Sequence, residues 1–283
     1  MSLDPGVTAL VLLAAVMHAG WNAVTKSSPD RTLTLALVLG TSALTGIVAC
    51  FFVPFPAPES HPFLLVSAGF HALYQIFLLQ AYRFGDLSHV YPIARGLAPV
   101  LVALFASLFA AEVPDGIQAL GLGVASASIA SLALEPRTLG PGATRSVVAA
   151  LLTAAMIGTY TFLDGQGVRR AGVSHAYIAW NIWMTSMPFC LFVLLRRRAR
   201  LAAILRTSEG LKGVAAGVTS TVGYGIVLWA MDRGAMASVA ALRETSVVFA
   251  ALIGTLVLGE AFGARRIFAA LGVALGVILL QAH

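Results

Sequence analysis

Three ionisable residues lie inside long apolar stretches, where charge is rare. Arg95 lies about eight residues into one stretch, and Arg243 with Glu244 lies at a similar depth in another. In a helix this depth is roughly 12 Å, where an ionisable group costs on the order of 2.5–3.5 kcal/mol unless it faces a cavity or a partner. Either arginine could hold a substrate carboxylate or phosphonate through its planar guanidinium. Either could instead form a structural ion pair, which we favour for Arg243 because Glu244 is adjacent.

Glu244 also has two interpretations. A buried carboxylate that alternates between protonation and substrate binding would suit a proton-coupled carrier. A fixed partner of Arg95 or Arg243 is the interpretation we favour, because charges inside a membrane usually pair. We specifically predict an Arg95–Glu244 pair across the axis that would relate the two halves of the chain.

A polar helix face is predicted near the N-terminus. His18, Trp21 and Asn22 have i, i+3, i+4 spacing, and Lys26 extends their face by one turn. Such a face points inward, either to line a cavity, with His18 a candidate proton carrier, or to make interhelical hydrogen bonds.

Other polar-tipped side chains in apolar stretches extend the candidate cavity. They are His71, Tyr74, Gln75, Tyr82, Tyr91, Tyr160, Trp180, Asn181 and Tyr224. Aromatic residues near the ends of spans are more often interface anchors than ligands, which we expect of Trp183 and Trp229, whereas Tyr91 and Trp21 neighbour other inward candidates. An aromatic cavity beside a charged group would suit amphipathic amino acids.

Four residues are candidates for gating or hinge motion. Lys26 and Asp164 close predicted spans and could gate the cavity, or could simply lie at the interface with access to water. Pro92 and Pro99 bracket Arg95, and proline kinks a helix by removing a backbone donor. The kink could act as a hinge or could be static.

The composition identifies the environment of these residues. Of 283 residues, 59% are hydrophobic and 11% are charged, and the mean hydropathy is +0.89. Soluble domains are about 45–50% apolar and about 25% charged. An integral membrane protein follows, and disordered, collagen-like, coiled-coil and ordinary cytosolic enzyme classes are excluded. The sequence has no P-loop, zinc-type spacing or nucleophile elbow, so we expect no metal and no cofactor.

We predict an all-α membrane fold with ten transmembrane helices around a central cavity. The first five-helix repeat, residues 1–137, holds spans 4–26, 31–54, 62–83, 87–110 and 114–134. The second, residues 138–283, holds spans 145–165, 173–195, 209–231, 235–259 and 263–281. Small-residue patches at Gly121 and Gly123, and at Gly272 and Gly276, predict close helix contacts.

An internal repeat is indicated by charge spacing. Arg95 and Arg243 are each followed 17 residues later by a glutamate at the end of the span, Glu112 and Glu260. Five spans per half is an odd number, so the halves would be inverted relative to one another. Three basic residues fall in loops on the N-terminal face and thirteen on the opposite face. This bias predicts both termini outside the cytoplasm.

Three stretches resemble the drug/metabolite transporter superfamily, EamA type. They are Leu13–Lys26 in the first span, Gly85–Pro99 entering the fourth span, and the run ending in Leu258-Gly-Glu260 in the ninth span. The resemblance implies a carrier of small metabolites, often amino acids and usually exported. It also implies a cavity formed by spans one, three, four, six, eight and nine.

We therefore predict a secondary transporter, an exporter of amino acids or related zwitterionic or anionic solutes, that works by alternating access. We expect it in a bacterial inner membrane as a monomer or homodimer, without nucleic acid, and leave proton coupling open. A lipid or lipid-linked sugar flippase of the same fold is the alternative, and an intramembrane enzyme is a more distant one.

Overall fold

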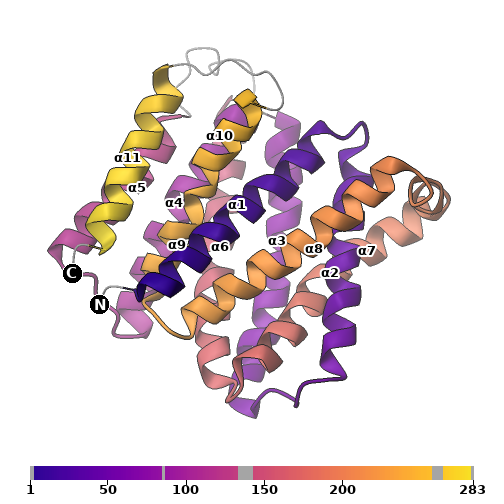
Figure 1. Ribbon diagram of the computed structural model, residues 1–283, viewed down its shortest axis with the longest axis horizontal. Coiled ribbons are helices and arrows are strands. Elements are labelled where there is room, and N and C mark those ends of the chain that lie inside the picture. The colour runs from indigo at the N-terminus through magenta and orange to yellow at the C-terminus, as the bar shows by residue number, and fades with distance from the viewer. Residues whose placement is uncertain (1–2, 85–86, 133–142, 257–263, 282–283) are drawn as a thin grey trace.

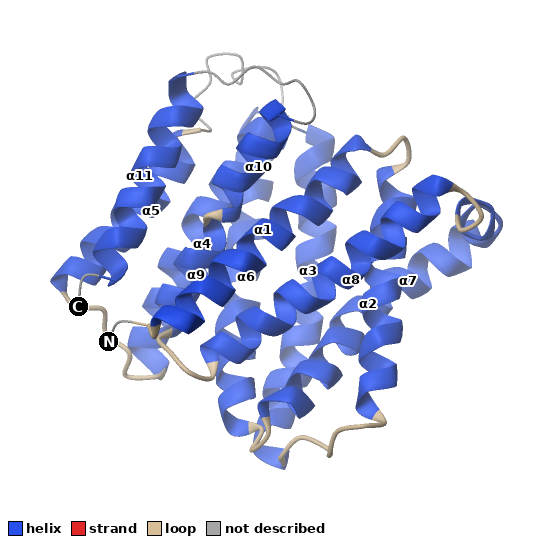
Figure 2. Cartoon of the chain, in the orientation of Figure 1, coloured by secondary structure: helices blue, strands red, loops and turns tan. Residues whose placement is uncertain are grey.

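Every element of the described chain is a helix (Figure 2). The structure, a computed structural model, describes residues 3–84, 87–132, 143–256 and 264–281. The first half contains α1 (Pro5–Ser27), α2 (Arg31–Cys50), the 3-10 helix η1 (Pro58–Ser60), α3 (His61–Phe84), α4 (Leu87–Phe109) and α5 (Gly116–Ser131). The second half contains α6 (Ala143–Arg170), α7 (Ser174–Ile204), α8 (Ser208–Met231), α9 (Met236–Glu244), α10 (Ser246–Leu256) and α11 (Ala264–Gln281).

The chain is an integral multi-pass membrane protein. Among the described residues, seven helical segments are long and apolar enough to cross a membrane, and Gly116–Ser131 and Ile267–Gln281 are shorter apolar helices. A helix lies at the position of each predicted span. Ten crossings and an inverted repeat stay predictions.

Acidic residues in the polar loops cap the N-termini of several helices. Asp4 accepts a hydrogen bond from Gly6 N at 2.8 Å, and Asp30 accepts one from Leu33 N at 3.1 Å. Asp115 and Gln118 form a capping box at the start of α5. These side chains pair the amide groups that a helix start leaves free.

Two helices run further than the hydropathy predicted. α6 reaches Arg170 instead of 165, because its last turns are buried by neighbouring helices: Gln166 and Val168 are buried. α7 reaches Ile204 instead of 195, with a non-helical residue at Arg197. Past that kink, Leu201 and Ile204 pack against the start of α2. Burial against other helices therefore accompanies the extension of α6, whereas residues 194–200 in the extension of α7 are exposed.

The predicted ninth span is divided into two helices. α9 ends at Glu244 and α10 begins at Ser246. The amide and the hydroxyl of Thr245 both donate to the carbonyl of Leu242, at 3.1 and 2.7 Å. This i, i+3 turn interrupts the helix in its buried middle, next to the charged residues.

Two helix pairs lie at opposite edges of the bundle. α5 packs on α11 at one edge and α2 on α7 at the other, with the remaining helices between them (Figure 1). A Cβ built on Gly121 would lie 2.7 Å from the carbonyl oxygen of Gly276, so the predicted close contact is confirmed there. Gly123 faces open space and makes no such contact.

Candidate functional site

The predicted pair between Arg95 and Glu244 is confirmed. Arg95 Nε lies 2.6 Å from Glu244 Oε2, and both side chains are almost completely buried. Arg95 also donates from Nη2 to Ser246 Oγ at 3.2 Å, so it is fixed to both sides of the α9–α10 break. Arg243 Nη2 lies 3.3 Å from Glu244 Oε1. We call Arg95, Arg243, Glu244 and Ser246 the arginine cluster.

The arginine cluster has an excess of positive charge. Two guanidinium groups share one carboxylate, so the cluster carries a net charge of +1. Arg243 is 4% exposed, and its Nε has no hydrogen-bond partner among the described residues. A buried guanidinium has five N–H donors, and leaving one unpaired is unfavourable. An anion at Arg243 would satisfy both the charge and the donor.

A second buried cluster surrounds Asp164, which is 0% exposed. Its Oδ1 accepts hydrogen bonds from Asn181 Nδ2 at 2.7 Å and Tyr177 Oη at 3.2 Å. Its Oδ2 accepts one from Tyr224 Oη at 2.5 Å and lies 3.1 Å from His71 Nε2. These residues come from α3, α6, α7 and α8 and form what we call the aspartate cluster.

The sequence-based placement of Asp164 was wrong. It was expected at the end of a span, but α6 continues to Arg170 and places it in the helix interior. The helix does not end where hydropathy falls, because its last turns are covered by other helices. The gating role assigned to Asp164 stays a prediction, now for an interior residue.

Tyr160 lies between the two clusters. Its ring stacks on His71 with centroids 3.8 Å apart, and Tyr74 meets its edge at 5.7 Å. It also lies in the electrostatic field of Arg95, Arg243, Glu244 and Asp164. The predicted aromatic neighbourhood is therefore present and connects the two sets of charges.

The predicted polar face of α1 contributes mainly through His18. His18 lies within electrostatic range of Arg95 and Arg243, and Trp21 meets its ring edge-on at 5.1 Å. The side-chain amide of Asn22 donates to the backbone carbonyl of His18 at 2.8 Å, so this hydrogen bond lies within α1. Lys26 is exposed at the end of α1.

Other predicted residues do not join the clusters. Trp180 packs against Phe55, with ring centroids 4.6 Å apart, although the adjacent Asn181 binds Asp164. Neighbouring residues on a helix point in different directions, which separates the two. Gln75 is half-buried, and Pro92 and Pro99 are buried inside α4, which is one continuous helix. The side chains of Tyr82 and Tyr91 lie outside the described residues.

Two members of the clusters were not predicted. Tyr177 lies one helical turn before Asn181, and that i, i+4 spacing could have identified it. Ser246 lies two residues after Glu244 and accepts a hydrogen bond from Arg95, and no sequence pattern indicated that contact.

A third polar contact joins the loops at one end of the bundle. Glu112, just after α4, forms an ion pair with Arg169 near the end of α6 and accepts a hydrogen bond from Met236 N at 3.0 Å. Arg169 also donates to the carbonyls of Met231 and Gly234, at 2.7 and 2.6 Å. This Glu112–Arg169 latch joins the first half of the chain to the α8–α9 connection.

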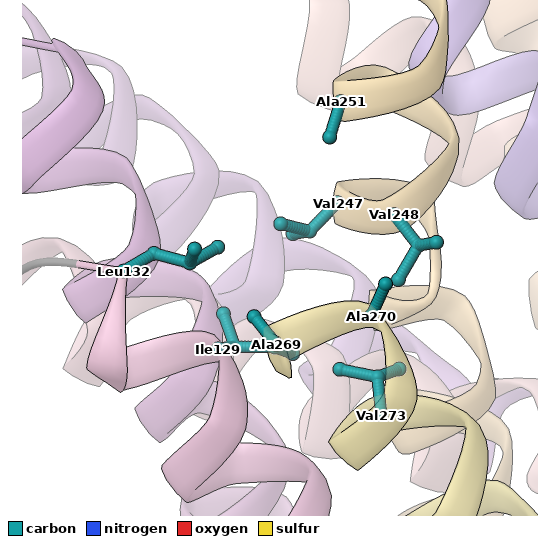
Figure 3. Close-up of a pocket in the computed structure, with 8 residues that line it drawn as sticks. All are labelled: Ile129, Leu132, Val247, Val248, Ala251, Ala269, Ala270 and Val273. Carbon is teal, nitrogen blue, oxygen red and sulfur yellow. The ribbon is translucent and has the colours of Figure 1, made fainter. Parts of the chain in front are cut away.

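An apolar crevice lies between α5, α10 and α11 (Figure 3). Its lining consists of Ile129, Leu132, Val247, Val248, Ala251, Ala269, Ala270 and Val273. It has no charged or hydrogen-bonding side chain, so it offers a polar solute nothing that the two polar clusters offer.

Comparisons with known proteins agree with the helical architecture. Residues 144–281 match the family model described as the EamA-like transporter family. A solved structure described only as a crystal structure of a protein has 19% identity and a TM-score of 0.75, covering 98% of this chain and 95% of that chain. At that identity the likeness establishes the fold alone, over both halves. No curated protein matches the sequence.

Proposed function

Because residues 144–281 belong to the EamA-like transporter family, we propose that the chain is a secondary transporter for a small anionic or zwitterionic metabolite. Amino acids and related compounds with a carboxylate or phosphonate group are the proposed substrates, and export is the proposed direction. The resemblance stated from the sequence supports this assignment.

The observation that carries the proposal is the unbalanced charge at Arg243. Glu244 approaches Arg95 at 2.6 Å and Arg243 at 3.3 Å, so it neutralises Arg95 more closely. The guanidinium of Arg243 keeps a buried, unpaired Nε. We therefore assign the substrate anion to Arg243 and a positioning role to Arg95, the reverse of the preference derived from the sequence.

The packing pattern supports an inverted repeat and alternating access. In the proposed repeat, α1 corresponds to α6 and α3 corresponds to α8. The contact of α1 with α8 is then the counterpart of the contact of α6 with α3. α6 also packs on α4 as α1 packs on α10. Such exchange of partners is expected when two repeats rock against one another around a central site.

The Glu112–Arg169 latch fits a closed end of that cycle. It lies at the end of α6 and near the N-terminal segment, since Leu3 packs against Gly234. From the loop charges we propose that this face points away from the cytoplasm of a bacterial inner membrane. Opening toward that face would require the latch to break.

The test is uptake of labelled L-alanine, L-aspartate, L-phenylalanine and methylphosphonate into proteoliposomes. Wild type should give saturable uptake of at least one compound, and Arg243→Gln should reduce it at least tenfold with a raised KM. Arg233→Gln is the matched control, because that arginine is exposed and packs over Trp229. Uptake that is unchanged in Arg243→Gln would overturn the assignment. If folded protein moves none of the compounds but translocates a labelled phospholipid, the flippase alternative holds instead.

A further inference from the structure

The carboxylate of Asp164 has a complete set of hydrogen-bond donors. Asn181 and Tyr177 donate to one oxygen, and Tyr224 and His71 lie on the other. An ionised carboxylate accepts about four hydrogen bonds, so this shell leaves no position for a substrate ammonium group. Asp164 must therefore serve a purpose other than direct contact with the substrate.

The charge of the aspartate cluster depends on one group. Asn181 is an amide that carries no charge, and Tyr177 and Tyr224 donate neutral hydroxyl groups. His71 is the contact residue that can gain a positive charge. Its Nε2 faces a carboxylate that only accepts, so Nε2 carries a hydrogen and Nδ1 is the nitrogen that can bind a further proton.

Considered together, the two clusters are balanced until a ligand arrives. Arg95 and Arg243 oppose Glu244 and Asp164, so the net charge of the four is zero when His71 is neutral. A bound anion adds one negative charge, and a proton on His71 adds one positive charge. Tyr160 stacks on His71 and lies in the field of both arginines, so the two charges would form close to one another.

From this geometry we propose that His71 and Asp164 form a proton-binding site, and that a proton on His71 and an anion at Arg243 favour each other's binding. The anion half of this coupling rests on the proposed function. The proton is transferred from hydronium or a protonated buffer in the water to the lone pair of Nδ1, and no other bond changes. By linkage, each ligand raises the affinity for the other by the same factor.

The exposed fractions of the two side chains favour His71 as the residue that receives the proton. The side chain of His71 is 12% exposed and that of Asp164 is 0% exposed, so the imidazole is the accessible member of the pair. The titratable groups that contact the pair are Tyr160 on α6, Tyr177 on α7 and Tyr224 on α8. The field of Arg95 on α4 and of Arg243 and Glu244 on α9 reaches Tyr160. A charged imidazole next to Asp164 makes a neutral ion pair, which a low-dielectric interior tolerates better than a lone charge.

The first experiment observes the proton directly and needs no transport. Protein labelled with 15N-histidine is placed in lipid nanodiscs, and the His71 signal is assigned by its loss in His71→Gln. We expect the ring nitrogens to change from the neutral to the doubly protonated pattern as the pH is lowered. At fixed pH, added methylphosphonate should increase the protonated fraction, and this increase should vanish in Arg243→Gln.

His175 is the internal control, because it is exposed at the start of α7 and its signal should not respond to the anion. Asp164→Asn should abolish the protonated form of His71 in the same titration. A His71 ring that stays neutral throughout, or that titrates identically in Asp164→Asn, would overturn the proton site.

The second experiment measures coupling in proteoliposomes that contain a pH-sensitive dye. For any panel compound that wild type transports, one proton should move in the same direction with each net anionic charge, so export down an outward solute gradient should carry protons out. A membrane potential should leave the rate unchanged. His71→Gln should lose the proton movement but should still exchange internal for external anion at no less than one tenth of the wild-type rate. Transport without proton movement in wild type would overturn the coupling. If no compound is transported, the function assignment fails, and the nanodisc titration alone decides the proton site.

Discussion

The arginine cluster and the aspartate cluster are both buried and both contain a carboxylate, yet they stabilise it differently. Glu244 is balanced by full positive charges from Arg95 and Arg243. Asp164 is surrounded by the neutral donors Tyr177, Asn181 and Tyr224, with one histidine. The first arrangement has fixed charges, two positive groups against one carboxylate. The second has a charge that a proton can change.

The largest expected effect separates the two carboxylates. Glu244→Gln leaves two buried guanidiniums without a counter-charge, so we expect unfolding free energy to fall by about 3–5 kcal/mol. Thermal unfolding of the purified protein in detergent measures this. Glu209→Gln is the control, since Glu209 pairs with Lys212 in an exposed contact worth about 1 kcal/mol or less. Equal melting temperatures for Glu244→Gln and wild type would contradict the comparison.

Asp164→Asn should be less damaging. The amide replaces the carboxylate among the neutral donors Tyr177, Asn181 and Tyr224, and Glu244 stays in place against the two arginines. We expect a loss of about 1–3 kcal/mol from the donor that becomes unpaired. The same unfolding measurement applies, and a loss greater than that of Glu244→Gln would reverse the ranking of the clusters.

The two arginines provide a sharper test inside one cluster. Arg95→Met removes the 2.6 Å contact and the bond to Ser246, so we expect a loss of about 1–3 kcal/mol. Arg243→Met leaves a balanced Arg95–Glu244 pair, so stability should stay within about 1 kcal/mol while anion transport is lost. Each variant is assayed by unfolding and by proteoliposome uptake. Arg243→Met that unfolds more readily than Arg95→Met would assign the structural role to Arg243.

The smallest expected effect distinguishes two donors to Asp164. Tyr224 donates at 2.5 Å and Tyr177 at 3.2 Å, so Tyr224→Phe should cost more than Tyr177→Phe, with both within about 0.5–3 kcal/mol. Unfolding in detergent again gives the difference. If Tyr177→Phe costs more, packing of that ring and not the carboxylate contact dominates, since Tyr177 also fills space against Gly167.

The sequence predicted the helical positions well because apolar length determines them in a membrane. It also predicted the Arg95–Glu244 pair, because a charge in that environment needs a partner. It also favoured a pair between Arg243 and the adjacent Glu244, and that pair is present, with Arg243 Nη2 3.3 Å from Glu244 Oε1. Consecutive residues on a helix diverge by about 100°, so Glu244 turns toward Arg95 on another helix.

The aspartate cluster was the part that sequence reasoning could not assemble. His71, Tyr160, Asp164, Asn181 and Tyr224 were each predicted as site residues, yet no pattern showed that four helices bring them together. Asp164 was placed at a span end because polar residues follow it. Only tertiary burial of the last turns of α6 shows otherwise.

The contact between Gly121 on α5 and Gly276 on α11 has a consequence for the proposed alternation between inward-open and outward-open forms. The two helices approach so closely that a Cβ at either glycine would meet the other helix's backbone, and each helix is the proposed counterpart of the other. When the two repeats exchange roles, α5 takes the place of α11 and α11 that of α5, so the contact between them stays the same in both forms. A Gly121→Ala substitution should therefore lower the stability of both forms equally, by about 1–3 kcal/mol, without biasing the protein toward either face of the membrane.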